Sequence, residues 1–265
     1  MTDQVVYLYG IVGADMSLEG APLGVESTAV ELEREGGLGA LISWLPAVEY
    51  DRARIEPLVG DVAWVGGRAV AHDGVVTWAS ERGGVIPVPM FTLYSDTARL
   101  RAMLGERQGD LALTLAHVAR GEEYGVRVFR LDDVLTRHLG EMSPDLARLE
   151  AQAQLASPGQ RYLLERKAEV KRTAELRRVG SDVARETFDS LAPHALESTR
   201  EAVPRYDSEP VGGAAVLNSF YLVRRGALEP FRRSLATLAG RYEPRGFRFE
   251  FTGPWPPYHF VKERE

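Results

Sequence analysis

Residues 247–261 read FRFEFTGPWPPYHFV, and their first part alternates between phenylalanine and polar side chains. The alternation runs from Phe247 to Phe251 and has a period of two, which is typical of a β-strand with one buried and one solvated face. Gly253 then begins a proline-rich stretch, in which each proline fixes φ and lacks a backbone donor. The sequence therefore predicts a core strand that ends in a stiff turn bearing two aromatic rings.

This turn, Trp255-Pro256-Pro257-Tyr258, has two interpretations. It is either a rigid corner whose Trp and Tyr rings seal the sheet, or an aromatic platform that binds a partner. The sequence leaves both open. We take the four residues as the candidate partner-binding site.

The composition bounds the classes of function. The chain has 265 residues and a formal net charge of −6, so it lacks the electrostatic attraction for phosphate backbones on which nucleic-acid binding usually depends. It has no cysteine, which excludes disulfides, thiolate catalysis and cysteine-ligated metal sites. The N-terminus shows no basic leader, and no apolar run reaches the roughly 18 residues of a membrane span. We expect a cytoplasmic protein without nucleic-acid or lipid-membrane partners.

The N-terminal part of the chain shows patterns of both strands and helices. We expect strands at 5–12, 27–32, 38–45 and 85–89, two helices or one bent helix within 54–82, and a helix capped by Ser95 and Asp96 that ends by Gly121. Glycines within both helical stretches weaken them, because each costs about 1 kcal/mol relative to alanine. This part is predicted to form an α+β domain, residues 1–121.

The C-terminal part, residues 122–265, is predicted to form a second α+β domain. We expect strands at 122–131, 214–223 and 247–252, helices starting at Ser143 and Ser157, and a helix over 228–242. The two helices before residue 201 are expected to form a long antiparallel hairpin. Strand, helical insertion, strand, helix and strand follow the order of a split βαβ unit. The expected fold class is therefore α+β with two domains, the second containing a modified ferredoxin-like sheet with a long helical hairpin.

The helix after Ser157 is highly charged. Three ion pairs at i,i+3 spacing are expected on its exposed face, Glu169–Arg172, Glu175–Arg178 and Asp182–Arg185. Six of its basic residues are Arg166, Lys167, Lys171, Arg172, Arg177 and Arg178. They form either a solvated face or an anion site, and the acids interleaved among them in the sequence favour a solvated face.

Motifs that carry chemistry are missing. The sequence has no glycine-rich phosphate loop, no G-x-S-x-G and no HExxH, and its histidines, at 72, 117, 138, 194 and 259, lack metal-ligand spacing. His72 is followed by Asp73, but adjacent residues on a helix point about 100° apart and cannot form an oriented pair. We assign no catalytic residue and expect neither a metal nor another cofactor.

Seven segments resemble the GvpF/GvpL family of gas vesicle proteins. They are YLYGIV (7–12), DVAWVGGRAVAHDGVV (61–76), VIPVPMFTLYSD (85–96), EEYGVRVFRL (122–131), SPGQRYLLERK (157–167), LNSFYLV (217–223) and TGPWPPYHFV (252–261). The chain departs from the family in the third segment, where Pro89 and Met90-Phe91-Thr92 stand in place of an arginine and a Phe-Gly-Thr. No role of those family residues is carried over.

The resemblance implies a gas vesicle accessory or minor structural protein without enzymatic activity. Its expected partners are the hydrophobic shell subunit, which it would protect from aggregation during assembly, and other gas vesicle accessory proteins. Its expected location is the cytoplasm and the gas vesicle. The fold class alone also fits a cytoplasmic small-molecule-binding sensor or enzyme, which a convergent polar pocket would distinguish. The candidate surfaces for the shell subunit are the edge of the second sheet and the turn at 255–258.

Overall fold

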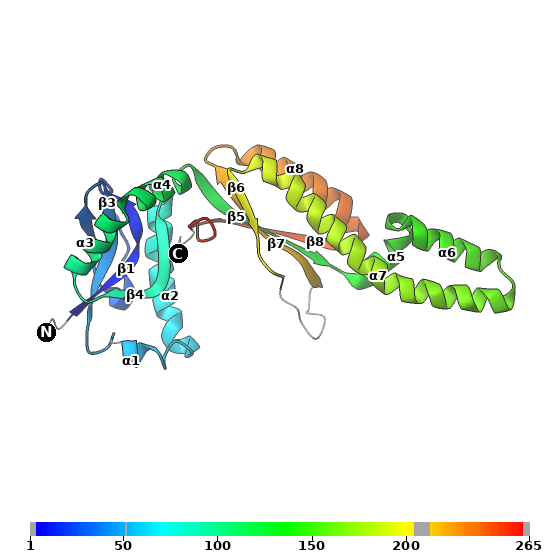
Figure 1. The fold of residues 1–265 in the computed structure, drawn as a ribbon, viewed down its shortest axis with the longest axis horizontal. Coiled ribbons are helices and arrows are strands. Elements are labelled where there is room, and N and C mark those ends of the chain that lie inside the picture. Colours follow the sequence, from blue (N-terminus) through cyan, green and yellow to red (C-terminus); the bar gives the residue numbers. More distant parts are fainter. Residues whose placement is uncertain (1–3, 51, 204–212, 262–265) are drawn as a thin grey trace. The chain divides into compact units, whose positions relative to one another are not determined.

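The computed structural model describes residues 4–50, 52–203 and 213–261, which fold into two compact units (Figure 1). Unit 2 comprises Tyr124–Gly253, and unit 1 comprises the chain up to Glu123 together with the segment from Pro254 onward. We had expected the whole of 122–265 in the second domain. The terminal segment returns to unit 1 because its apolar side chains pack there: Phe260 is buried, and Val261 contacts the core formed by Val6, Ile86 and Leu111 among others.

Unit 1 is built on a four-stranded sheet with the order β2-β3-β1-β4. The strands are β1 (Gln4–Gly13), β2 (Glu31–Glu35), β3 (Leu38–Pro46) and β4 (Ile86–Tyr94). The two central strands, β1 and β3, pair antiparallel along nearly their whole length. Residues 27–30, which we had expected to begin β2, precede it instead, and Ser27 ends a 3₁₀ turn, Val25–Ser27.

Helices cover both faces of the sheet in unit 1. They are α1 (Arg52–Ile55), α2 (Val62–Glu81), α3 (Thr97–Glu106) and α4 (Gln108–Val118). Tyr7 and Tyr9 share one core with α2, while Val6 and Leu8 share another with α3 and α4. Strand β1 is therefore buried on both faces, as its continuous apolar sequence predicts. The expected cap of α3 is confirmed, since the Asp96 carboxylate accepts the N–H of Arg99.

Unit 2 has the βαββαβ order of a ferredoxin-like fold. Its elements are β5 (Gly121–Arg130), α5 (Asp132–Met142), α6 (Pro144–Leu155), α7 (Pro158–Leu191), a 3₁₀ turn (Ala192–His194), β6 (Glu197–Arg200), β7 (Ala214–Arg224), α8 (Leu228–Tyr242), a 3₁₀ turn (Glu243–Arg245) and β8 (Phe247–Trp255). The strand order is β6-β7-β5-β8, which places β6 and β8 at the edges. The expected fold class is confirmed, whereas α5 and β6 were not predicted.

One face of the second sheet carries the core of unit 2. Val126, Tyr221 and Phe247 pack there against residues of α5, α7 and α8. Phe249 and Phe251 are partly buried against the same core, so the alternation in residues 247–251 has its expected meaning. Gly246 makes the turn into β8 with φ of 95°. A Cβ at this position would come within 2.4 Å of the backbone nitrogen of Leu135, so a side chain is excluded there.

Helices α6 and α7 form the expected hairpin, which extends from the sheet of unit 2 (Figure 1). Val179 and Val183 of α7 face the core of unit 2. No capping box forms at Ser157: its side chain caps no backbone N–H, and its hydroxyl donates to the side-chain oxygen of Gln160 at 3.1 Å. Among the described residues, no helix is long and apolar enough to cross a membrane.

Candidate functional site

Strand β8 continues through Gly253 and Pro254, where we had expected it to end, to Trp255. Residues 255–258, here called the aromatic corner, expose their rings and bury their prolines. Trp255 is 46% exposed and Tyr258 is 40% exposed, while Pro256 and Pro257 are buried. The Tyr258 backbone N–H donates to the Pro256 carbonyl at 2.8 Å. Because each proline fixes its own φ and is packed on the inner side, the two rings are presented by a stiff backbone.

A buried carboxylate anchors the chain directly after the corner. Glu123 is 1% exposed, and its two oxygens contact His259, one accepting the backbone N–H at 3.0 Å and the other lying 2.6 Å from the ring Nδ1. Charge-assisted contacts of this length are stronger than neutral ones. We call this arrangement the corner clasp. It fixes the corner to β5, from which Glu123 projects.

A small pocket lies beside the corner within unit 1. It has a volume of about 230 Å³ and is lined mainly by apolar side chains of β4, α4 and the terminal segment, including Val88, Leu111, Tyr258 and Val261. Arg107 and Asp110 of its lining are charged. The pocket is smaller than the roughly 300–1,000 Å³ of typical small-molecule sites.

The Tyr258 hydroxyl faces α2. It lies 3.5 Å from the Asp73 carboxylate, at the outer limit of a hydrogen bond. Burial of the hydroxyl raises the pKa of Tyr258, and the Asp73 carboxylate raises it further. Tyr258 therefore stays protonated over the physiological range and can donate a hydrogen bond.

His72 is a core residue and forms no pair with Asp73. It is 4% exposed, its Nδ1 lies 2.9 Å from the Tyr7 hydroxyl, and burial lowers its pKa. Its neighbour Asp73 faces Tyr258 instead. The two residues thus point in different directions, as the helical spacing predicts, and His72 supports the packing of α2 on the sheet.

Strand β4 is irregular next to the pocket. Leu8 pairs with Thr92, but Gly10 pairs with Pro87, so the register of β4 shifts by several residues within this stretch. Phe91 adopts φ of 64°, which is uncommon for a bulky residue.

Nothing in the described part of the chain forms a metal centre. No three His, Asp or Glu side chains there lie close enough together to hold an ion. His138 contacts Glu141 at 3.2 Å, and His259 contacts Glu123 in the corner clasp.

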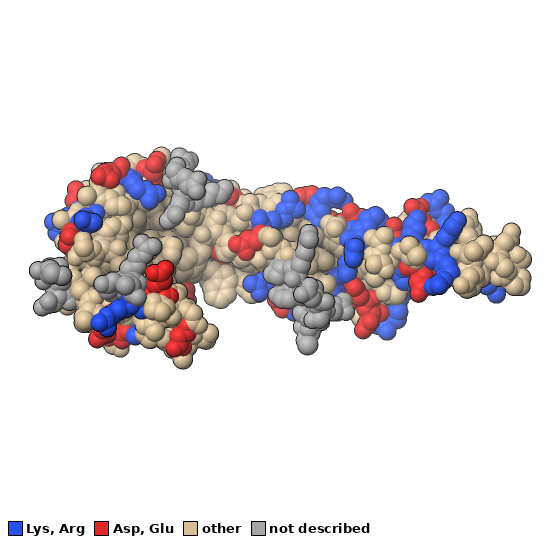
Figure 2. Space-filling model, turned by 60° about the horizontal axis from the view of Figure 1, so that its bottom comes forward, with Lys and Arg blue, Asp and Glu red and all other residues tan. Residues whose placement is uncertain are grey.

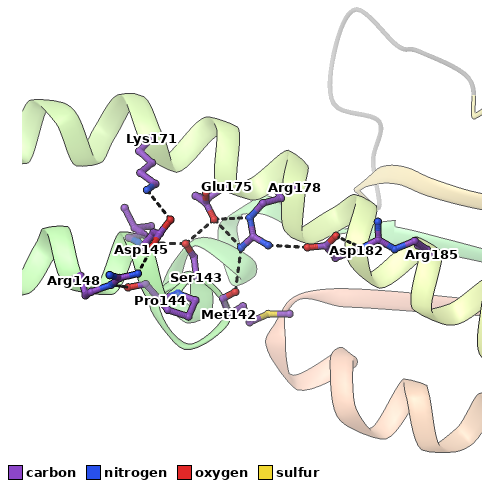
Figure 3. Close-up of polar contacts among 11 residues, drawn as sticks. Met142, Ser143, Pro144, Asp145, Arg148, Lys171, Glu175, Arg178, Asp182 and Arg185 are labelled. Carbon is purple, nitrogen blue, oxygen red and sulfur yellow. Dashed lines mark hydrogen bonds and ion pairs between the residues drawn. The ribbon is translucent and has the colours of Figure 1, made fainter.

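A second buried carboxylate fixes the base of the hairpin in unit 2 (Figure 3). The Ser143 hydroxyl donates to Glu175 at 2.6 Å, and the Arg178 guanidinium donates to the same carboxylate at 2.9 Å. These contacts, with the Arg178 hydrogen bond as the larger cause, hold the pKa of Glu175 below its usual value. We call Ser143, Glu175 and Arg178 the hairpin clasp. Glu175 is thus buried rather than on the exposed face on which we had expected it.

The other ion pairs of the hairpin agree only in part with the expected ones. Asp182 and Arg185 pair at 2.6 Å as predicted, and Lys171 bonds to Asp145 at 3.3 Å (Figure 3). The prediction of a Glu169–Arg172 pair is wrong, because α6 offers Arg172 a different partner. The pairs formed instead are Arg172–Glu150 at 3.0 Å and Arg166–Glu169 at 3.4 Å.

Comparisons with known proteins point to a single family. The family model described as "Gas vesicle synthesis protein GvpL/GvpF" matches residues 5–262. The chain is 28% identical to gas vesicle protein L from a Streptomyces species, over 98% of this chain and 94% of that protein. It is 26% identical to gas vesicle protein L1 from Halobacterium salinarum, over 97% of this chain and 90% of that protein.

A solved structure shares the fold. The crystal structure of the gas vesicle protein GvpF from an Anabaena species superposes with a TM-score of 0.68, covering 99% of this chain and 98% of that one at 17% identity. The expected resemblance of the seven segments to this family is confirmed over nearly the whole chain.

Proposed function

Because the chain belongs to the GvpL/GvpF family of gas vesicle synthesis proteins, we propose that it binds the hydrophobic shell subunit of the gas vesicle and keeps it from aggregating during assembly. It acts by binding, without turnover and without a cofactor. Its place is the cytoplasm and the gas vesicle, where other accessory proteins are further partners.

The aromatic corner is the observation that carries this proposal. A platform for an apolar partner needs exposed apolar surface that does not collapse on itself. Trp255 and Tyr258 supply that surface, and the buried prolines and the corner clasp hold it in place. Rigid aromatic rings bind with little loss of conformational entropy. The pocket lined by Tyr258 adds a site for one apolar side chain of the shell subunit.

The edges of the second sheet are less suited to the shell subunit. Edge β6 has only four residues, Glu197–Arg200, and edge β8 carries Pro254 near its end. A short strand offers few backbone groups, and a proline lacks the N–H for strand addition. We therefore propose the aromatic corner, Trp255, Pro256, Pro257 and Tyr258, as the contact with the shell subunit.

Co-expression of the tagged protein with the shell subunit, followed by affinity capture, tests this function. The wild type should retain the shell subunit, and Trp255→Ala and Tyr258→Ala should each retain markedly less. Tyr162→Ala, which removes an exposed ring from α7 in unit 2, is the matched control and should retain as much as the wild type. Circular dichroism verifies that each variant is folded. Failure of the wild type to retain shell subunit above background would remove the proposal.

A further inference from the structure

The outer half of α7 presents a face that no other helix of unit 2 covers. Leu163, Lys167, Val170, Ala174 and Arg177 follow one another at spacings of four, three, four and three residues, and all five are exposed. Leu163 is 62% exposed and Val170 is 78% exposed. This spacing places them along one line of the helix, which is the arrangement of a seam that receives another helix. We call these five residues the outer seam.

The charges of α7 are sorted around the helix, although they are interleaved in the sequence. With about 100° per residue, the acids Glu165, Glu169 and Glu175 lie more than about 90° from the line of the outer seam. The basic residues Arg166, Lys171 and Arg178 border it on both sides. The solvated mixed face that the sequence favours is therefore, in three dimensions, a basic face with its acids on the flanks. In Figure 2 blue Lys and Arg side chains lie along the hairpin, with red Asp and Glu side chains among them.

Two cations on the outer seam have no counter-charge. Arg166, Lys171 and Arg178 pair with the acids Glu169, Asp145 and Glu175. Lys167 and Arg177 make no ion pair or side-chain hydrogen bond with any residue of the described chain. Lys167 stands between Leu163 and Val170, and Arg177 follows Ala174 at the end of the seam. An apolar line with unpaired cations is complementary to a partner that carries apolar residues and carboxylates in the same spacing.

We propose that the outer seam docks an acidic amphipathic helix of a partner protein, in a coiled-coil-like arrangement. Apolar partner residues would pack on Leu163, Val170 and Ala174, and carboxylates would pair with Lys167 and Arg177. This surface belongs to unit 2, whereas the aromatic corner belongs to unit 1, and the inference does not depend on the proposed function.

Two other occupants fit less well. A second copy of α7 would bring Lys167 and Arg177 of both chains into one interface, which is repulsive. An anionic lipid surface requires a wide apolar face with bulky side chains to insert. The apolar part of the outer seam is narrow, and its cations lie among the apolar residues instead of on a separate polar face. An acidic amphipathic helix could pack on the apolar residues of the seam and also pair its carboxylates with the two cations.

A designed peptide provides the probe. It is a fluorescent helix with Leu at a and d positions and Glu at e and g positions, whose own Glu–Glu repulsion keeps it from pairing with itself. Fluorescence anisotropy at low salt measures its affinity for the full-length protein. A second peptide with Lys in place of Glu is the charge control. Vesicles containing anionic phospholipid test the lipid alternative by co-sedimentation.

Two sets of variants separate charge from packing. Lys167→Glu with Arg177→Glu should lower the affinity for the acidic peptide by about tenfold or more. The control, Arg137→Glu with Arg233→Glu, makes an equal charge change at exposed positions elsewhere in unit 2, and it should leave this affinity nearly unchanged. The reversed seam should instead bind the Lys peptide. Leu163→Gln with Val170→Gln should lower the affinity for the acidic peptide although the charge of the protein is unchanged. Circular dichroism monitors helix content in all variants.

The inference is overturned by any of three results: equal binding of both peptides to the wild type, equal loss in the seam and control charge variants, or binding to anionic vesicles that depends on Lys167 and Arg177 in the absence of peptide binding. Absence of measurable acidic-peptide binding by the folded wild type also overturns it.

Discussion

Two buried carboxylates, Glu123 and Glu175, hold the aromatic corner and the base of the helical hairpin, and they do so in different ways. The Glu123 carboxylate contacts the backbone N–H and the ring of His259, which lies 136 positions away in the sequence. Glu175 accepts hydrogen bonds from Ser143, which precedes α6, and from Arg178, which lies one turn along its own helix. The carboxylate of the corner clasp therefore makes a long-range contact, whereas that of the hairpin clasp belongs to a network with a partner on its own helix. Substitutions of Glu123 and of Glu175 should therefore change the free energy of unfolding by different amounts.

Glu123→Ala should have the largest effect. It leaves the His259 backbone N–H and ring without their buried acceptor, and we expect a loss of about 3 kcal/mol of unfolding free energy. All four tryptophans, at 44, 64, 78 and 255, belong to unit 1, so urea unfolding followed by Trp fluorescence reports on that unit. Glu106→Ala, at an exposed acid of α3, should change stability by less than about 0.5 kcal/mol. Equal effects of the two substitutions would show that the corner clasp is unimportant.

Glu175→Ala should cost less, about 2 kcal/mol. Arg178 remains paired with Asp182 at 2.7 Å, and its side chain is 46% exposed, so water and a second carboxylate compensate in part. Far-UV circular dichroism during urea unfolding reports on the helices of unit 2, while the Trp fluorescence of unit 1 should keep its midpoint. Glu169→Ala, which breaks an exposed pair, is the control and should be nearly neutral. A shift of the Trp transition equal to that of the helical one would contradict the local character of the clasp.

The hairpin clasp should also weaken in acid. The pKa of Glu175 is lower in the folded protein than in the unfolded chain, so its ionised form stabilises the fold above the unfolded value of about 4.3. This contribution is lost as the pH falls through the folded pKa. The stability difference between the wild type and Glu175→Gln should therefore shrink as the pH falls from 7 to 3, as measured by urea unfolding. A difference that stays constant over this range would exclude the ionised carboxylate as its source.

Tyr258→Phe should have the smallest effect, below about 0.5 kcal/mol. The hydroxyl lies 3.5 Å from Asp73, where a hydrogen bond contributes little, and the ring itself is retained. Trp fluorescence during urea unfolding is again the measurement. A loss above about 1 kcal/mol would mean that the hydroxyl, rather than the corner clasp, holds the corner.

The parts of the fold that local patterns determine were predictable from the sequence. The alternation in residues 247–251 gave β8, and apolar residues at three- and four-residue spacing gave α8. Strand β6 was missed because Glu-Ser-Thr-Arg has no apolar pattern of its own. It becomes a strand through antiparallel pairing with β7, from Glu197 opposite Leu222 to Arg200 opposite Ser219.

The candidate site was predictable only in its residues. The sequence singled out the proline-bearing aromatic turn, but two later facts needed three dimensions: the turn packs into unit 1, and Glu123 anchors it. Neither has a local signal, because the contact spans 136 positions. The outer seam of α7 was likewise not recognised from the sequence. Its acidic and basic residues are interleaved along the chain, and they lie on different sides of the helix only because each residue turns it by about 100°.

The most direct test compares the two surfaces in one assay, the amount of shell subunit that the co-expressed, affinity-captured protein retains. The double variant Trp255→Ala with Tyr258→Ala should lose most of the retained subunit, while Lys167→Glu with Arg177→Glu should retain it at the wild-type level, both variants keeping the wild-type circular dichroism. Full retention by the folded corner variant, with loss in the seam variant, would contradict the account and move the shell-binding surface from the aromatic corner to α7.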